Sequence, residues 1–166
     1  MSEAAIQTIR LTMVREGEPL GCCTQALDVA KVARAVLGRL SEDRECFFTL
    51  HLDTRNKVTG VDVVSIGSLN GSLVHPREVF KAAILSNAAG LILVHNHPSG
   101  DCSPSREDME LTRRLCEAGR LMRIEVLDHL VIGDGAYFSF REKGLICGDI
   151  QSGLSSDAVP AIGAVV

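Results

Sequence analysis

Two histidines that stand two positions apart are the residues of this chain best suited to chemistry. His95 and His97 are followed, after a turn-rich loop, by Ser105 and Asp108. Two imidazoles and one carboxylate form the protein ligand set of a catalytic zinc ion, with one tetrahedral position left for water. Because zinc lowers the pKa of such a water to about 7, it supplies hydroxide at neutral pH. The pattern therefore predicts hydrolysis at a Zn²⁺ site.

A buried strand delivers the two histidines. Leu91 to Val94 is a continuous apolar run that leads directly to His95, which is typical of a strand buried on both faces. Side chains two apart on a strand point to the same face, so His95 and His97 project together if the strand continues through His97. The alternative is a pair of polar residues bonded to backbone at a strand end. That interpretation suits one histidine better than a His-x-His pair.

A helix predicted from about Ser105 to Arg120 supplies the carboxylate. Asp108 lies in one helical stripe with Leu111, Leu115 and Met122, so it heads the apolar face. A buried carboxylate without a partner is unfavourable, and a metal ion would relieve that penalty. The alternative is a capping box, in which Ser105 and Asp108 satisfy the first backbone groups of the helix. Both interpretations can hold in part, and the histidines favour the metal.

The remaining pattern predicts a single α/β domain with no internal repeat. A tail rich in Ser, Gly and Ala follows Gly148 and is expected to be disordered or to pack on a partner. The other predicted elements are a strand over Ile6 to Val14, a helix capped by Thr24 and running to about Leu40, a hairpin of Cys46 to Leu52 and Val58 to Ile66, a helix from Pro76 through Ser86, and closing strands over Ile124 to Ile132 and Tyr137 to Phe140.

Composition narrows the class of protein. A chain of 166 residues suits one domain, and its formal net charge is -4, so direct binding of nucleic acid through phosphate contacts is not expected. The arginines at 113, 114, 120 and 123 alternate with glutamates, which is typical of a solvated helix face.

Three further features bear on the compartment of the protein. No apolar run reaches the ~20 residues of a membrane span. The first five residues show no basic segment followed by an apolar one, so we expect no secretory signal and a cytoplasmic protein. Six cysteines without a C-x-x-C pair predict free buried thiols rather than disulfides or a zinc finger.

The spacing of the candidate residues resembles a known signature. His95-x-His97, seven residues, Ser105, two residues and Asp108 match the JAMM motif of JAB/MPN metallopeptidase-like domains. The flanking segments resemble the bacterial RadC family over roughly residues 24 to 147. These segments are Val74-His75-Pro76-Arg77-Glu78, Ala89 through Gly100, and Asp128-His129-Leu130-Val131-Ile132-Gly133.

The resemblance implies a curved mixed sheet flanked by helices, with a cytidine-deaminase-like architecture. It implies that His95, His97 and Asp108 bind zinc and that Ser105 stabilises the developing oxyanion. It also implies that Glu45 is the general base. The residues alone leave Glu42, Asp43 and Glu78 equally plausible for that role. His75 and His129 recur in the family pattern, as groups around the metal ligands or, as we expect, as structural hydrogen-bonding residues.

The resemblance also sets the expected domain organisation. Residues 1–23 form an N-terminal strand and loop extension, residues 24–148 a RadC-like JAB/MPN domain, and residues 149–166 a tail. Longer RadC-type proteins carry an N-terminal helix-hairpin-helix-like region, whereas this chain has only about 23 residues before its first helix. Cys102 lies inside the metal loop and is expected to be incidental, because a thiolate ligand would displace the catalytic water.

Three functions fit these features. The first is a zinc-dependent metallohydrolase that cleaves peptide or isopeptide bonds of a peptide or protein substrate with a zinc-activated water. The second is an accessory protein of DNA repair, which only the traditional family name suggests. The third is a catalytically silent MPN-type interaction module, because a fold alone does not fix a function. The complete set of candidate residues favours the first.

Overall fold

The computed structural model describes residues 17, 20–40, 43–67 and 74–146. The predicted strand over Ile6 to Val14 and the predicted tail at 149–166 lie outside the described residues. The domain boundaries proposed from the sequence stay predictions.

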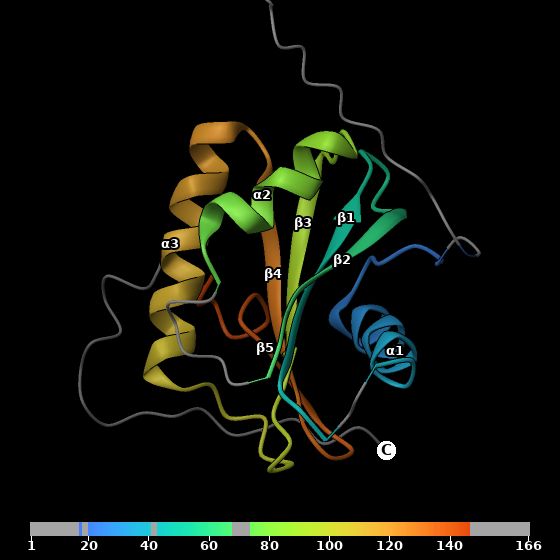
Figure 1. Cartoon of the computed structure of the whole chain (residues 1–166), viewed down its shortest axis with the longest axis vertical. Coiled ribbons are helices and arrows are strands. Elements are labelled where there is room, and N and C mark those ends of the chain that lie inside the picture. Colours follow the sequence, from blue (N-terminus) through green and yellow to red (C-terminus); the bar gives the residue numbers. More distant parts are fainter. Residues whose placement is uncertain (1–16, 18–19, 41–42, 68–73, 147–166) are drawn as a thin grey trace, which may run out of the picture.

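A five-stranded mixed sheet forms the centre of the molecule, in the order β2-β1-β3-β4-β5 (Figure 1). Strands β3 and β4 pair in parallel, and the other neighbouring pairs are antiparallel. Both strands of the predicted hairpin have the predicted bounds. The strands are β1 (Cys46–Leu52), β2 (Val58–Ile66), β3 (Gly90–Asn96), β4 (Glu125–Ile132) and β5 (Tyr137–Ser139).

Helices cover both faces of this sheet, as the α/β prediction requires. Helix α1 (Ala26–Leu37) packs on one face, and α2 (Pro76–Leu85) and α3 (Arg106–Met122) pack on the other (Figure 1). Along β3, Ile92 and Val94 join the core beneath α1, while Leu91 and Leu93 join the core beneath α2 and α3. Alternation therefore directs the next side chain of the second series, that of His95, toward α3.

The first two helices begin differently from each other. The N-cap of α1 is Gln25, so the prediction of Thr24 is wrong by one residue. Asp28 is the reason, because its carboxylate accepts from the Thr24 hydroxyl at 3.0 Å and from the Gln25 amide at 3.3 Å. His75 caps α2, and its Nδ1 accepts from the Arg77 amide at 3.2 Å. This contact gives His75 the structural role expected of it.

Helix α3 has Ser105 as its N-cap, and Asp108, Leu111 and Leu115 are buried as predicted. Met122 is wrongly placed in the predicted stripe, because 39 % of its surface is exposed. It is the last residue of the helix, where the chain leaves for β4 through Arg123 in a left-handed conformation.

The described cysteines include both free thiols and a disulfide-bonded one. Cys22, Cys23, Cys46 and Cys102 are free thiols, whereas Cys116 is disulfide-bonded. The prediction of free buried thiols is therefore wrong at Cys116, and wrong about burial at Cys22, which is exposed. Within the described part of the chain, no helix is both long and apolar enough to cross a membrane.

Candidate metal centre

The two histidines lie where β3 ends. The strand ends at Asn96, one residue earlier than the predicted continuation through His97. The His97 amide still donates to the carbonyl oxygen of Ile132 at 2.9 Å, so the chain keeps its place beside β4. The two imidazoles consequently project together, with their Nε2 atoms 3.0 Å apart. His95 is fully buried, and 18 % of the His97 side chain is exposed.

The carboxylate of Asp108 approaches both imidazoles from the first turn of α3. Its Oδ1 lies 3.3 Å from Nε2 of His95, and its Oδ2 lies 3.6 Å from Nε2 of His97. Burial opposes ionisation of Asp108, but the adjacent His95 and His97 and the hydrogen bond from Ser105 outweigh burial and hold the pKa of this carboxyl well below its usual range. Asp108 is therefore an anion within a largely buried site.

The capping interpretation of Asp108 is realised in the same structure. Its Oδ2 accepts from the backbone amide and from the hydroxyl of Ser105, both at 2.7 Å. The hydroxyl oxygen of Ser105 accepts in turn from the Asp108 amide at 3.1 Å. Capping thus occupies Oδ2, while Oδ1 faces His95, so the two interpretations use different atoms of one carboxylate.

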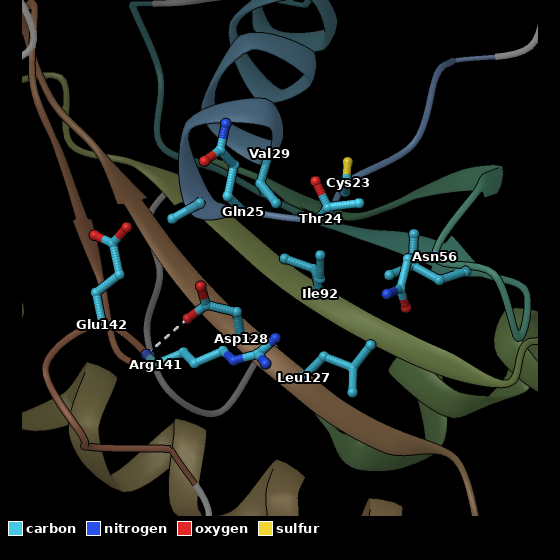
Figure 2. A pocket seen from close by; sticks show the side chains of 12 residues that line it. Cys23, Thr24, Gln25, Val29, Asn56, Ile92, Leu127, Asp128, Arg141 and Glu142 are labelled. Carbon is cyan, nitrogen blue, oxygen red and sulfur yellow. Dashed lines mark hydrogen bonds between the residues drawn. The ribbon is translucent and has the colours of Figure 1, made fainter.

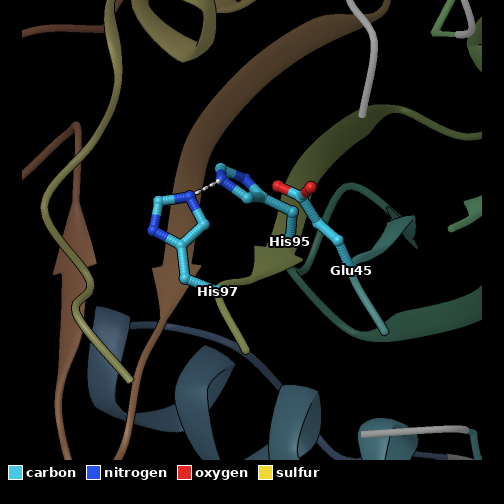
Figure 3. Close-up of side chains that lie close together, drawn as sticks. All are labelled: Glu45, His95 and His97. Carbon is cyan, nitrogen blue, oxygen red and sulfur yellow. Dashed lines mark hydrogen bonds between the residues drawn. The ribbon is translucent and has the colours of Figure 1, made fainter. Parts of the chain in front are cut away.

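A second carboxylate, from the segment before β1, also lies close to the histidines. Glu45 directly precedes β1. One of its carboxylate oxygens, one ring nitrogen of His95 and one ring nitrogen of His97 all lie within 4.8 Å of one another. Figure 3 shows its carboxylate turned toward the ring of His95. Sequence alone did not separate Glu45 from three other acidic residues. Asp43 is exposed, Glu78 pairs with Lys81 on α2, and Glu42 lies outside the described residues.

Asn96 fixes the backbone on both sides of Glu45. Its side chain faces away from the histidines, where its Oδ1 accepts from the Cys46 amide at 2.8 Å and its Nδ2 donates to the Arg44 carbonyl at 3.0 Å. The residue between the two histidines therefore ties β3 to the segment that carries Glu45. Sequence analysis missed this contact, because no local pattern shows which backbone groups a side chain will meet.

Each imidazole has a hydrogen-bonding partner at its second nitrogen. Nδ1 of His97 lies 2.7 Å from the carbonyl oxygen of Asp101, and Nδ1 of His95 lies 2.8 Å from Nε2 of His129. A carbonyl oxygen only accepts, so Nδ1 of His97 carries a proton, and Nε2 is the nitrogen left for a metal. The hydrogen bond with Asp108 raises the pKa of His97, so a metal binding at Nε2 would displace a proton there. Burial between Phe47 and Phe140 holds the pKa of His129 well below the usual value for histidine, so that ring is neutral.

The two imidazole nitrogens lie close to the spacing that a tetrahedral metal requires, and a carboxylate stands beside both. Two nitrogens held at Zn–N distances of about 2.0–2.1 Å in tetrahedral geometry lie roughly 3.3 Å apart. The Nε2 atoms of His95 and His97 lie 3.0 Å apart, and each has its own oxygen of Asp108 nearby, Oδ1 at 3.3 Å from His95 and Oδ2 at 3.6 Å from His97. Two imidazole nitrogens and a carboxylate oxygen suit zinc and other divalent transition metals. These residues therefore fit the metal that the spacing predicted.

Cys102 takes no part in this group of donors. Its side chain is 1 % exposed and packs with Val131, Phe138 and Phe140 in a small apolar cluster. Burial raises the pKa of its thiol, which keeps it protonated and a poor metal ligand. The expectation that Cys102 is incidental to the metal loop agrees with this placement.

Two hollows lie near the ends of the central strands. One of about 310 Å³ borders His97 and is lined by the loops at 98–100 and 133–135, together with Arg34 of α1. The other, of about 340 Å³, also borders α1, where Val29 lines it together with Ile92 of β3 (Figure 2). In the second hollow, Asp128 accepts from the Arg141 amide at 2.9 Å. Only the first hollow adjoins the candidate metal ligands.

Comparison with known proteins places the chain in a family. The model of the RadC-like JAB domain matches residues 23–145. The UPF0758 protein of Moorella thermoacetica is 53 % identical over 135 residues, which cover 78 % of this chain and 59 % of that protein. Its counterpart in Methanosarcina acetivorans is 56 % identical over 105 residues, or 63 % and 46 % of the two chains. That of Trichlorobacter lovleyi is 61 % identical over 103 residues, or 62 % and 45 %. The chain spans about half the length of these relatives.

Proposed function

The chain belongs to the family of RadC-like JAB domains, and we propose that it is a zinc-dependent hydrolase of amide bonds in peptides or proteins. One observation carries the proposal. Two imidazole nitrogens and a carboxylate converge within 3.6 Å at the end of a buried strand, and a second carboxylate stands beside them. A metal site with an adjacent base contains the groups that hydrolysis requires.

The ligands in this proposal are His95, His97 and Asp108. Zinc bound there would polarise the scissile carbonyl and lower the pKa of water. Asp108 is preferred to Glu45 as the third ligand because its oxygens approach both Nε2 atoms and its position is fixed by the capping box.

Glu45 is the general base in this proposal. One of its carboxylate oxygens lies within 4.8 Å of a ring nitrogen of each histidine, and the carboxylate is turned toward the ring of His95 (Figure 3). The hydrogen bonds of Asn96 to Arg44 and Cys46, and that of the Gly67 amide to the Glu45 carbonyl at 2.9 Å, hold its backbone in place. A base positioned in this way accepts a proton without rearrangement of the chain.

Ser105 has two roles to reconcile. Its only hydroxyl proton is donated to Asp108 Oδ2 in this structure. To stabilise an oxyanion, the hydroxyl must turn that proton toward the substrate, while its oxygen keeps the Asp108 amide as a donor. We expect this rotation only when substrate is bound.

The substrate and partners follow from the same features. The hollow of about 310 Å³ borders His97 among the proposed ligands and offers room for part of a substrate beside the site. The net charge of -4 argues against direct binding of nucleic acid. We therefore propose a peptide or protein substrate, and propose neither a nucleic acid nor a membrane as a partner.

The test is hydrolysis by the zinc-loaded chain. A library of internally quenched peptides and isopeptide-linked peptides is incubated with the wild type, Glu45→Gln and zinc-free protein. Cleavage by the wild type alone supports the proposal. Cleavage that persists equally in Glu45→Gln, or none from a protein shown to hold zinc, contradicts it and favours an interaction module.

A further inference from the structure

Three consecutive hydrogen bonds join one candidate metal ligand to the backbone of another. Nδ1 of His95 lies 2.8 Å from Nε2 of His129, and Nδ1 of His129 lies 2.6 Å from the hydroxyl oxygen of Thr112. The Thr112 hydroxyl donates to the carbonyl oxygen of Asp108 at 2.6 Å. These three hydrogen bonds, called the relay below, run from His95 on β3 through His129 on β4 to Thr112 and Asp108 on α3.

The direction of each proton follows from the last bond. A hydroxyl has one proton, and the carbonyl of Asp108 only accepts, so the oxygen of Thr112 is left to accept from Nδ1–H of His129. The His129 ring is fully buried between two aromatic rings, where a second ring proton would place an uncompensated charge in the core. Its Nε2 therefore accepts from Nδ1–H of His95. His95 in turn keeps an unprotonated Nε2, which is the atom that faces His97 and Asp108.

We propose that His129 and Thr112 are positioning residues that hold His95 in the tautomer with its Nε2 lone pair directed at the metal. This inference rests on the proposed metal site and adds two residues to it. Partners at the outer nitrogen of a ligating histidine fix its tautomer and its orientation. Here the partner is a second neutral histidine, and a buried threonine selects the tautomer of that histidine.

Among the residues that the structure describes, the His129 ring has no hydrogen-bonding partner other than His95 and Thr112. Thr112 and His129 are both fully buried. The His129 ring stacks on Phe140, with 4.9 Å between ring centroids, and meets Phe47 edge-on at 5.8 Å. Neither aromatic ring offers a polar atom, so a His129 that loses the Thr112 hydroxyl has an unpaired Nδ1–H. Its remaining recourse is to move that proton to Nε2, which reverses the bond to His95 and places a proton on His95 Nε2.

The test compares Thr112→Val with Thr112→Ser. Valine keeps the shape of threonine without the hydroxyl, and serine keeps the hydroxyl without the methyl group. Zinc affinity of the full chain is measured by competition with a chromophoric chelator at neutral pH, with circular dichroism as the check on folding. We expect Thr112→Val to bind zinc about 10- to 100-fold more weakly and Thr112→Ser to bind like the wild type. A folded Thr112→Val with wild-type affinity overturns the relay.

A second measurement needs neither a variant nor metal. Nitrogen-15 NMR of the metal-free wild type reports which ring nitrogen of His95 and His129 carries the proton. The relay predicts Nδ1–H on both rings, and Nε2–H on either ring overturns it. The two proposals fail separately. A wild type that binds no zinc defeats the proposed function, while the tautomers still decide the relay.

Discussion

The two carboxylates of the site are predicted to have different roles, and exchanging each for its amide separates them. Asp108→Asn keeps the shape and an oxygen for the capping box but removes the negative charge 3.3 Å from His95 Nε2. Glu45→Gln removes the base without changing His95, His97 or Asp108. We expect Asp108→Asn to lose zinc affinity and Glu45→Gln to keep it.

The size of the first effect follows from the energetics of zinc sites. A four-ligand site contributes about 10–16 kcal/mol at neutral pH, or about 2.5–4 kcal/mol per ligand. At about 1.4 kcal/mol for each tenfold change, Asp108→Asn should weaken zinc binding by roughly 100- to 1,000-fold. Its effect on folding should be small, because an asparagine oxygen still accepts from the Ser105 amide.

The assay is chelator competition on both variants, with thermal unfolding of the metal-free proteins as a control for the fold. Glu45→Gln should bind zinc within about threefold of the wild type, since the per-ligand loss of about 2.5–4 kcal/mol does not apply to it. The opposite pattern, with zinc lost in Glu45→Gln and kept in Asp108→Asn, would refute the assignment. It would make Glu45 the third ligand, in line with its own proximity to the two histidines.

Three further substitutions test the residues that support the site and the fold. Asn96→Ala removes the side-chain hydrogen bonds to the Cys46 amide and the Arg44 carbonyl, so urea denaturation should show a free energy of unfolding lower by about 1–3 kcal/mol. An unchanged midpoint would contradict the view that Asn96 holds the backbone on both sides of Glu45. Burial lowers the pKa of His51 to about 4, so its contribution to stability is complete above pH 6.5 and falls by about 3 kcal/mol as the pH drops toward 4. His51→Gln should flatten that part of the pH profile, and parallel profiles would contradict the account. A Cβ at Gly133 would overlap the Gly100 carbonyl oxygen and meet the Cys102 amide at 2.9 Å, so Gly133→Ala should lower both the melting temperature and zinc affinity. Gly21→Ala, where no heavy atom lies within 4 Å, is the matched control, and equal behaviour of the two variants would count against a tightly packed metal loop.

Local sequence patterns predicted most of the strands and helices. The hairpin of β1 and β2 has its predicted bounds, because alternation and turn residues are read within a few positions. The pairing of His95 with His97 follows from the two-residue period of a strand. The cap of α1 was displaced by one residue, because the reach of the Asp28 carboxylate decides between Thr24 and Gln25.

Contacts between distant segments were beyond such patterns. Glu45 lies about 50 positions before the histidines, and antiparallel pairing of Phe47 with His95 brings it to them. The resemblance to a family indicated Glu45, whereas its residue type and local sequence did not. Thr112 and Asn96 had no signal at all, because a threonine inside a helix and an asparagine between two histidines have many ordinary uses. Their partners are known only once the sheet has been assembled.

The measurement that tests the central claim most directly is the zinc content of the purified, tag-free chain. Elemental mass spectrometry is applied to the wild type and to His97→Ala, each confirmed as folded by circular dichroism. The account predicts about one zinc per chain in the wild type, as a single tetrahedral site requires, and its loss in the variant. A folded wild type that takes up no zinc after reconstitution at neutral pH would contradict the account and leave an interaction module as the better description.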